Sequence, residues 1–134
     1  MRRGWGRAVV AVSSAVALIV IVAMLAIAPA AAGTRTVVAR GTCSGDSHWR
    51  VELVKDDRRI AVGFKVEQGV VGDVWGAGIG HNGRVLFRAL LATHGDAGSF
   101  AVRVWTHNAD GPDFFRVRAR NLTTDEICRG RAVI

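Results

Sequence analysis

Short stretches in which apolar and polar residues alternate recur along most of the chain, separated by clusters of Gly, Asp, Asn and Ser. The clearest is residues 60–67, where Ile60, Val62, Phe64 and Val66 occupy every second position. Such alternation places one set of side chains on the buried face of a strand. Further strands are predicted at residues 36–43, 48–54, 99–107, 114–120 and 127–134. Seven to eight short strands predict an all-β fold, a single antiparallel β-sandwich of immunoglobulin-like type.

Residues 73–93 predict a β-hairpin, because Asn82-Gly83 lies between two β-type runs and both residues tolerate positive φ. A two-residue turn would pair His81 with Arg84 and would mix charge into an apolar face. A three-residue loop with Gly83 as the bulge residue pairs Gly80 with Arg84 and separates the faces, so we favour it. In that register Trp75, Ala77 and Ile79 share a face with Val85, Phe87, Ala89 and Leu91, and Gly76, Gly78 and Gly80 share the other with Arg84, Leu86, Arg88 and Leu90.

The N-terminal 32 residues have the organisation of a secretory signal peptide. Three arginines precede an apolar run at residues 8–28, and Pro29 is followed by small residues that form an Ala-x-Ala site. Cleavage after Ala32 would leave residues 33–134 as one secreted domain. The apolar run is long enough to nearly span a bilayer, so an uncleaved membrane anchor is the alternative. We therefore expect a secreted, extracellular or cell-envelope-associated protein.

The net charge is +7, and removal of Arg2, Arg3 and Arg7 with the signal peptide lowers it to about +4. Nucleic-acid binding is therefore not expected, although the remaining arginines favour anionic surfaces or polymers. The histidines at positions 48, 81, 94 and 107 lack ligand spacing, so we expect no metal site and no cofactor.

Cys43 and Cys128 are the only cysteines and lie near the two ends of the predicted domain. An even cysteine count in an exported protein indicates a disulfide, and only one pairing exists here. Two lone cysteines lack the paired spacing of a zinc site, and an oxidising compartment disfavours a free catalytic thiol.

A candidate binding face is predicted where the strands at residues 99–107 and 114–120 form a hairpin. Pairing Val104 with Phe115 keeps the inner face apolar and places aromatic and basic side chains together on the outer face. These are Arg103, Trp105, Phe114, Arg116 and Arg118. Rings beside guanidinium groups suit an anionic cell-envelope polymer, a polysaccharide or a protein partner. The alternative is that Trp105 and Phe114 are covered by another part of the chain.

Gly76, Gly78 and Gly80 alternate along one predicted strand, which leaves one side of it without side chains. This pattern is typical of a bent or thinly covered strand. It also allows a sharper hypothesis, in which the bare strip lets a flat ligand or another backbone approach.

The order and spacing of several short motifs resemble a group of small secreted proteins of high-GC Gram-positive bacteria (actinobacteria) with no assigned activity. The motifs are Gly41-Thr42-Cys43-Ser44 with Trp49, Asp56-Asp57-Arg58-Arg59-Ile60, Phe64-Lys65-Val66, Trp75, His81-Asn82-Gly83-Arg84, Gly98-Ser99-Phe100, Ala119-Arg120-Asn121 and Glu126-Ile127-Cys128-Arg129. The resemblance implies export and a disulfide-closed β-sandwich, and carries over no catalytic residue. This sequence departs from that group at the three alternating glycines and at Trp105. It also differs from an antibody domain, because the cysteines tie the first strand to the last.

No nucleophile–base pair, carboxylate pair or metal-ligand spacing stands out in the sequence. We therefore expect a non-enzymatic protein that binds or has a structural role at the cell envelope. Recognition of a protein or polysaccharide through the aromatic and arginine face is one alternative, and a small extracellular enzyme with a site assembled from scattered residues is another.

Overall fold

The computed structural model describes residues 33–134, and the predicted signal peptide at residues 1–32 lies outside the described residues. Eight strands follow in order: β1 (Arg35–Thr42), β2 (His48–Lys55), β3 (Arg59–Glu67), β4 (Val74–His81), β5 (Arg84–Ala92), β6 (Ser99–His107), β7 (Phe114–Asn121) and β8 (Ile127–Val133). The predicted strands lie within a few residues of these bounds, because alternation is a local property that neighbouring residues alone define.

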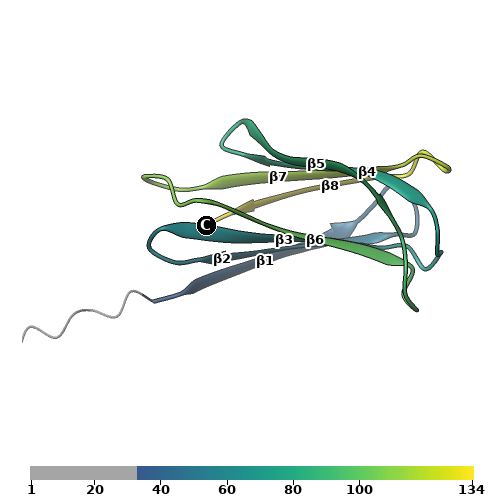
Figure 1. The fold of residues 1–134 in the computed structure, drawn as a ribbon, viewed down its shortest axis with the longest axis horizontal. Coiled ribbons are helices and arrows are strands. Elements are labelled where there is room, and N and C mark those ends of the chain that lie inside the picture. Colours follow the sequence, from purple (N-terminus) through teal and green to yellow (C-terminus); the bar gives the residue numbers. More distant parts are fainter. Residues whose placement is uncertain (1–32) are drawn as a thin grey trace, which may run out of the picture. The chain divides into compact units, whose positions relative to one another are not determined.

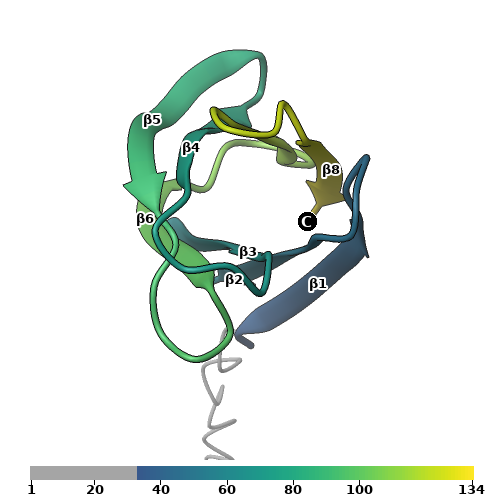
Figure 2. The ribbon, with the colours of Figure 1, turned by 90° about the vertical axis from the view of Figure 1, so that its right-hand side faces the viewer.

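The strands form two antiparallel four-stranded sheets, ordered β1-β2-β3-β6 and β5-β4-β7-β8. Figure 1 shows them as two layers, and Figure 2 shows β1 beside β8 on one side of the sandwich and β5 beside β6 on the other. The predicted all-β antiparallel β-sandwich is confirmed. Its strand order differs from the A-B-E-D and C-F-G sheets of an antibody domain, since here the first three strands are neighbours in sequence order.

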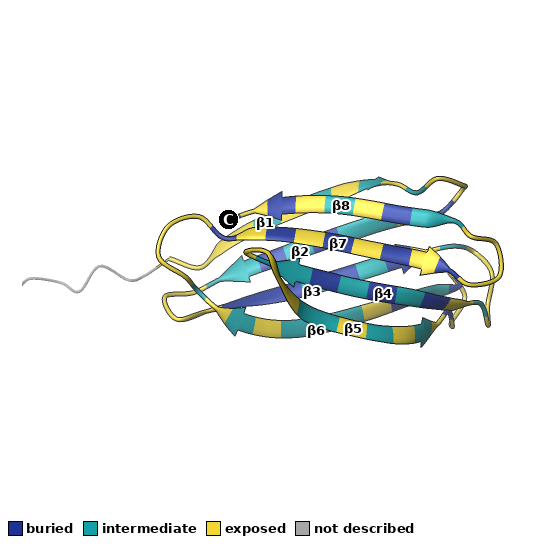
Figure 3. Cartoon of the chain, turned by 90° about the horizontal axis from the view of Figure 1, so that it is seen from above, coloured by how far each residue is buried: buried dark blue, intermediate teal, exposed yellow. Residues whose placement is uncertain are grey.

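The core lies between the two sheets and is filled by the alternate residues of each strand, as the banding in Figure 3 shows. Its largest side chains are aromatic. Phe100 of β6 packs edge-on against Phe64 of β3, with ring centroids 6.0 Å apart, and lies 6.1 Å from Trp75 of β4. Such contacts add to the burial of apolar surface and tie the two sheets together.

The β4–β5 hairpin differs from the predicted register. Asn82 and Gly83 both have positive φ, 48° and 81°, and form a two-residue turn that pairs His81 with Arg84. The bulge lies next to this turn, in β5. Gly80 pairs with Val85, but the preceding residue of β4, Ile79, pairs with Phe87, so β5 has one extra residue there. The predicted three-residue loop is therefore wrong. The extra residue in β5 still brings Phe87, Ala89 and Leu91 to the core side, while Val85 faces outward.

The predicted hairpin between the strands at 99–107 and 114–120 is also wrong. Strand β6 pairs with β3, with Val104 opposite Val62, and β7 lies in the other sheet between β4 and β8. The connection between them changes sheets, and Asp113 at its end exchanges backbone hydrogen bonds with Ile134. Alternating apolar residues on β6 fit the core equally well against either neighbour, so the pattern alone did not distinguish the two pairings.

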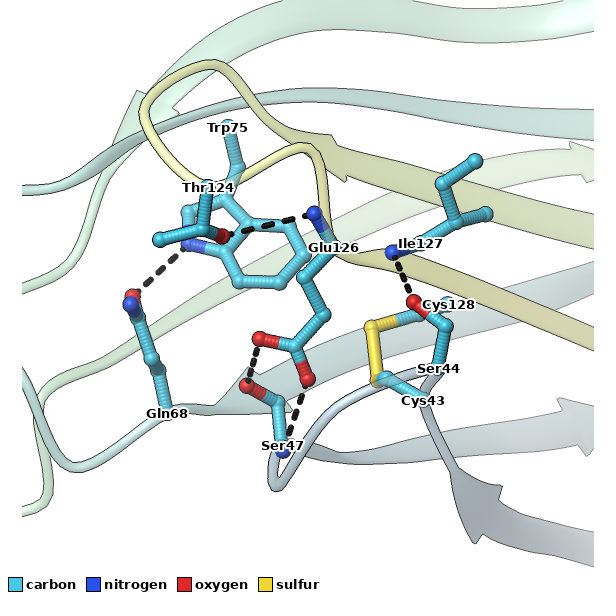
Figure 4. The surroundings of a disulfide bond; sticks show 9 residues. All are labelled: Cys43, Ser44, Ser47, Gln68, Trp75, Thr124, Glu126, Ile127 and Cys128. Atoms are coloured by element: carbon cyan, nitrogen blue, oxygen red, sulfur yellow. Dashed lines mark hydrogen bonds between the residues drawn. A yellow bond between two sulfur atoms is a disulfide. The ribbon is translucent and has the colours of Figure 1, made fainter.

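The predicted disulfide between Cys43 and Cys128 is present and connects the end of β1 to β8. A carboxylate reinforces the same corner: Glu126 accepts hydrogen bonds from the Ser47 backbone N–H (2.8 Å) and the Ser47 hydroxyl (2.9 Å). The backbone N–H of Ile127 donates to the Ser44 hydroxyl at 2.9 Å (Figure 4). The first and last strands are thus joined covalently and by a local hydrogen-bond network.

Trp49 of β2 fills the space beside this corner between two glycines. A Cβ atom at Gly41 of β1 would lie 2.7 Å from the indole, and one at Gly130 of β8 would lie 2.6 Å from it. Because these distances are shorter than van der Waals contact, the ring fits only where both neighbours lack a side chain.

We expect Gly130→Ala to lower the free energy of unfolding by about 1–3 kcal/mol, because the added methyl group overpacks against Trp49. Urea denaturation measures the change. Gly63→Ala on β3 is the matched control, since its Cβ would meet nothing closer than 3.8 Å. Equal stability of the two variants would contradict the proposed packing of Trp49.

Candidate functional site

The five residues of the predicted binding face lie on two different surfaces. Arg103 and Trp105 point outward from the β1-β2-β3-β6 sheet, whereas Phe114, Arg116 and Arg118 point outward from the β5-β4-β7-β8 sheet. The prediction that all five share one face is wrong because β6 and β7 belong to opposite layers. The structure does bring the last three together.

Trp105 is 52% exposed and lies opposite Ala61 of β3. Guanidinium groups approach its ring from two neighbours, Arg59 at 4.5 Å and Arg103 at 5.7 Å from the ring centroid. These cation–π contacts hold the indole on its own sheet.

Four other charges on that outer face form two ion pairs, whereas Arg40, opposite Arg50, has no carboxylate within ion-pair distance among the described residues. Arg50 pairs with Glu52, and Lys65 pairs with Glu67. Opposite charges interspersed in this way are typical of an ordinary solvated surface.

The outer face of the β5-β4-β7-β8 sheet is different, because its charge is almost entirely positive. We call it the arginine face, defined by six exposed arginines: Arg88, Arg116, Arg118, Arg120, Arg129 and Arg131. Arg120 pairs with Asp125 at 2.6 Å, and within residues 33–134 none of the other five has a carboxylate within ion-pair distance. This surface therefore concentrates positive potential.

Strand register sets these like charges directly beside one another. Arg116 lies opposite Arg131, and Arg118 lies opposite Arg129, across the β7–β8 pair. Like charges in opposing positions of a sheet destabilise the fold. The arrangement is therefore unfavourable to the folded state until an anion neutralises it.

The arginines border a groove of about 1100 Å³. Gly76, Gly78 and Gly80 form its floor, because they point outward from β4 and carry no side chain. One wall is β7, where Arg120, Arg118 and Arg116 stand opposite the three glycines. The other wall is β5, where Leu90, Arg88 and Val85 stand opposite the same glycines. The bare strip noted in the sequence is thus the bottom of an arginine-lined channel.

Sterics do not require glycine at these three positions. A Cβ atom would meet its nearest neighbour at 3.8 Å at Gly76, 3.6 Å at Gly78 and 3.5 Å at Gly80, all ordinary contacts, and none has positive φ. Glycine within a strand costs about 0.5–1 kcal/mol relative to alanine. Glycine therefore lowers the stability of β4 at each of these positions without relieving a steric clash. Its effect is to leave open space on the outer side of the strand.

A second polar cluster lies between the sheets at the end of the sandwich that holds the Asn82-Gly83 turn. Asp113 is fully buried and accepts hydrogen bonds from His81 Nε2 (2.6 Å), Asn82 Nδ2 (3.2 Å), the Ala109 N–H (3.3 Å) and Lys55 Nζ (3.4 Å). Burial raises the pKa of Asp113, but these hydrogen bonds, that from His81 foremost, outweigh it and hold the pKa below its usual value.

His81 connects this carboxylate to the opposite sheet. Nδ1 of His81 lies 3.0 Å from the Thr106 hydroxyl of β6, and in the neutral ring Nε2 donates to Asp113 while Nδ1 accepts from Thr106. The ring stacks on Phe115 with centroids 4.6 Å apart. The order carboxylate, imidazole, hydroxyl is that of nucleophilic catalysis. Since Asp113 precedes β7, His81 ends β4 and Thr106 belongs to β6, these contacts tie the two sheets together.

Sequence reasoning did not identify Arg88, Arg120, Arg129 or Arg131 as part of a binding face, nor Asp113 as a buried centre. The alternation of Arg129 and Arg131 with Cys128 and Ala132 was the available indication that both arginines point outward. Which strands lie beside them depends on the sheet order, which no local pattern contains. Among residues 33–134 no cluster of three or more His, Cys, Asp or Glu side chains could hold a metal ion.

Fold and covalent structure together define a small antiparallel β-sandwich protein closed by one disulfide between its first and last strands. Comparison with protein-family models, with curated protein sequences and with solved structures found no match to the chain. The resemblance to secreted actinobacterial proteins therefore stays a prediction. A disulfide is typical of extracellular proteins, and no helix in the described part of the chain could cross a membrane.

Proposed function

We propose that this protein is a non-enzymatic binding module that acts outside the cell or at the cell envelope and holds an anionic ligand on its arginine face. The observation that carries the proposal is the set of arginines on one sheet face, of which only Arg120 has a carboxylate partner among the described residues. Guanidinium groups present paired donors that match the oxygens of phosphate, sulfate and carboxylate groups.

Two further features support binding. The glycine floor keeps a channel open at a cost in strand stability, although alanine would fit at each position. The opposed arginine pairs are unfavourable in the free protein, and a bound anion would remove that repulsion. Stability sacrificed at one surface is typical of a functional site.

The proposed location depends on the predicted signal peptide and on the disulfide. Export would carry the domain into an oxidising compartment, where a disulfide persists. Anionic polymers and lipids of the envelope would then be within reach of the arginine face.

We expect the protein produced from the full chain to bind dextran sulfate and not neutral dextran, with an affinity that falls as salt is raised. The variant Arg118→Ser/Arg129→Ser should lose at least about tenfold in affinity, because each charge-assisted hydrogen bond contributes on the order of 1.5 kcal/mol. Isothermal titration calorimetry at several salt concentrations measures both effects.

Arg40→Ser/Arg103→Ser is the matched control, since it removes the same charge from the outer face of the other sheet. Its affinity should change less than about twofold. An equal loss in both double variants would show that only net charge matters and would reject the arginine face as a site. Thermal unfolding without ligand provides a further check, because relief of the Arg118–Arg129 repulsion should leave that variant at least as stable as the parent.

A further inference from the structure

The shape and charge spacing of the groove restrict which anion it fits. Building on the proposed function, we propose that the ligand is a single linear phosphodiester chain that lies lengthwise along β4, between the side chains of β5 and those of β7 and β8.

The width of the groove fits one chain. Neighbouring strands lie about 4.8 Å apart, so the walls on β5 and β7, one strand to either side of β4, stand about 10 Å apart across the glycine floor. An unbranched polymer can lie in such a channel. A nucleic-acid duplex or a branched glycan is too broad to reach the floor.

The arginines recur at a regular interval along the groove. Arg116, Arg118 and Arg120 are alternate residues of β7, so they are spaced about 7 Å apart and span about 14 Å. Arg131 and Arg129 of β8 stand beside the first two. The spacing of these arginines therefore matches the spacing of charges in a polymer that carries one charge per short polyol or sugar unit.

The paired arginines favour a phosphodiester over a carboxylate. The strand register sets Arg116 beside Arg131 and Arg118 beside Arg129, so each pair presents two guanidinium groups to the same part of the outer face. A phosphodiester has two free oxygens that diverge from a tetrahedral centre, so each can accept from a different guanidinium. A carboxylate has coplanar oxygens that a single guanidinium satisfies in bidentate fashion.

The opposite wall suits the uncharged linkers of such a chain. Val85 and Leu90 of β5 are each 68% exposed and stand opposite Gly80 and Gly76. They offer apolar contact to carbon atoms between successive phosphates.

The groove offers nucleobases little aromatic surface on which to stack. The aromatic residues that line the groove, Trp49 and Phe87, are partly buried and pack against the core. Phe114 is exposed at the end of β7, outside the groove lining. Single-stranded nucleic acid is normally held by successive stacked bases, so a polyol phosphate is favoured.

The test measures affinity against chain length, with oligomers of glycerol phosphate from one to eight repeats as probes. Affinity should rise by about tenfold for each of the first repeats and level off near three, when the three positions from Arg116 to Arg120 are filled. An abasic oligodeoxynucleotide should bind as well as one with bases. Duplex DNA, polygalacturonate and phosphatidylglycerol vesicles should bind at least tenfold more weakly per charge.

The Gly78→Val variant tests whether the ligand needs the open groove or only a charged surface. The substitution adds a side chain to the floor without changing the charge, and valine is favoured in strands, so folding should be preserved. Affinity for the four-repeat oligomer should fall at least tenfold. Gly63→Val on the outer face of the other sheet is the matched control and should bind like the parent protein.

The outcomes distinguish this inference from the proposed function. Affinity that does not grow beyond one repeat, equal binding of duplex DNA or vesicles, or full binding by Gly78→Val would overturn the lengthwise single chain and leave the anion-binding face intact. Equal binding of polygalacturonate would overturn the phosphodiester assignment. A requirement for bases would overturn the polyol phosphate. Failure of every anionic probe, dextran sulfate included, would reject the proposed function itself.

Discussion

Replacement of both Cys43 and Cys128 with alanine is expected to lower the free energy of unfolding by about 4 kcal/mol. The two residues are separated by 85 positions, and the chain-entropy model assigns about 4–5 kcal/mol to a loop of that length. Domains of this size have a total stability of about 5–15 kcal/mol. The disulfide should therefore account for between about a quarter and most of the total stability, and chemical denaturation followed by tryptophan fluorescence measures the loss.

Ser47→Ala provides the control in the same corner. It removes the hydroxyl that bonds to Glu126 and keeps the disulfide, so a loss of only about 1.5 kcal/mol is expected. If the double cysteine variant lost no more than Ser47→Ala, the non-covalent contacts of the corner would suffice to hold β1 to β8.

Asp113→Asn is expected to lower the free energy of unfolding by about 3 kcal/mol near neutral pH. The buried carboxylate is the common acceptor for donors from four positions, and an amide cannot satisfy them all. Loss of one partner from a buried charged network is costly because the remaining groups are left without compensation. Urea denaturation measures the change, and Asp110→Asn, at an exposed position of the same loop, should change stability by less than about 0.5 kcal/mol.

The difference between Asp113→Asn and the parent protein should depend on pH. The pKa of Asp113 is lower in the folded than in the unfolded state, so its contribution to stability is present above the unfolded pKa and disappears as pH falls through the folded pKa. The parent should therefore approach the variant in stability at acidic pH. A difference that stays constant from neutral to strongly acidic pH would contradict the role of the carboxylate charge.

Local sequence patterns were sufficient to predict the strands and insufficient to assign them to sheets. The alternation in residues 60–67 specifies a strand and its buried face, because both depend only on neighbouring residues. The partner of β6 depends instead on the path of the chain after His107. Asp113 anchors that path in the opposite layer through its backbone hydrogen bonds with Ile134, which is distant in sequence from β6.

The binding site, like the fold, could be predicted only in part from local sequence patterns. Outward-facing arginines on β7 and the bare side of β4 were both recognisable from alternation. Their juxtaposition was not, because it arises when β7 inserts between β4 and β8. The hairpin register failed for a related reason, since the bulge in β5 changes the pairing after the turn and no turn signature marks it.

Strand β8 affects the order in which the domain forms its ligand face and closes during folding. Strand β8 carries Cys128, the glycine that accommodates Trp49, and two arginines of the face. Its pairing with β7 is local, whereas its link to β1 spans most of the domain, and such long-range contacts form late in folding. The double row of arginines therefore forms as soon as β8 pairs with β7, whereas the covalent closure and the fitting of the indole come together when β8 meets β1 and β2. The ligand face is thus specified by a local pairing, and the long-range closure fixes it in the finished domain.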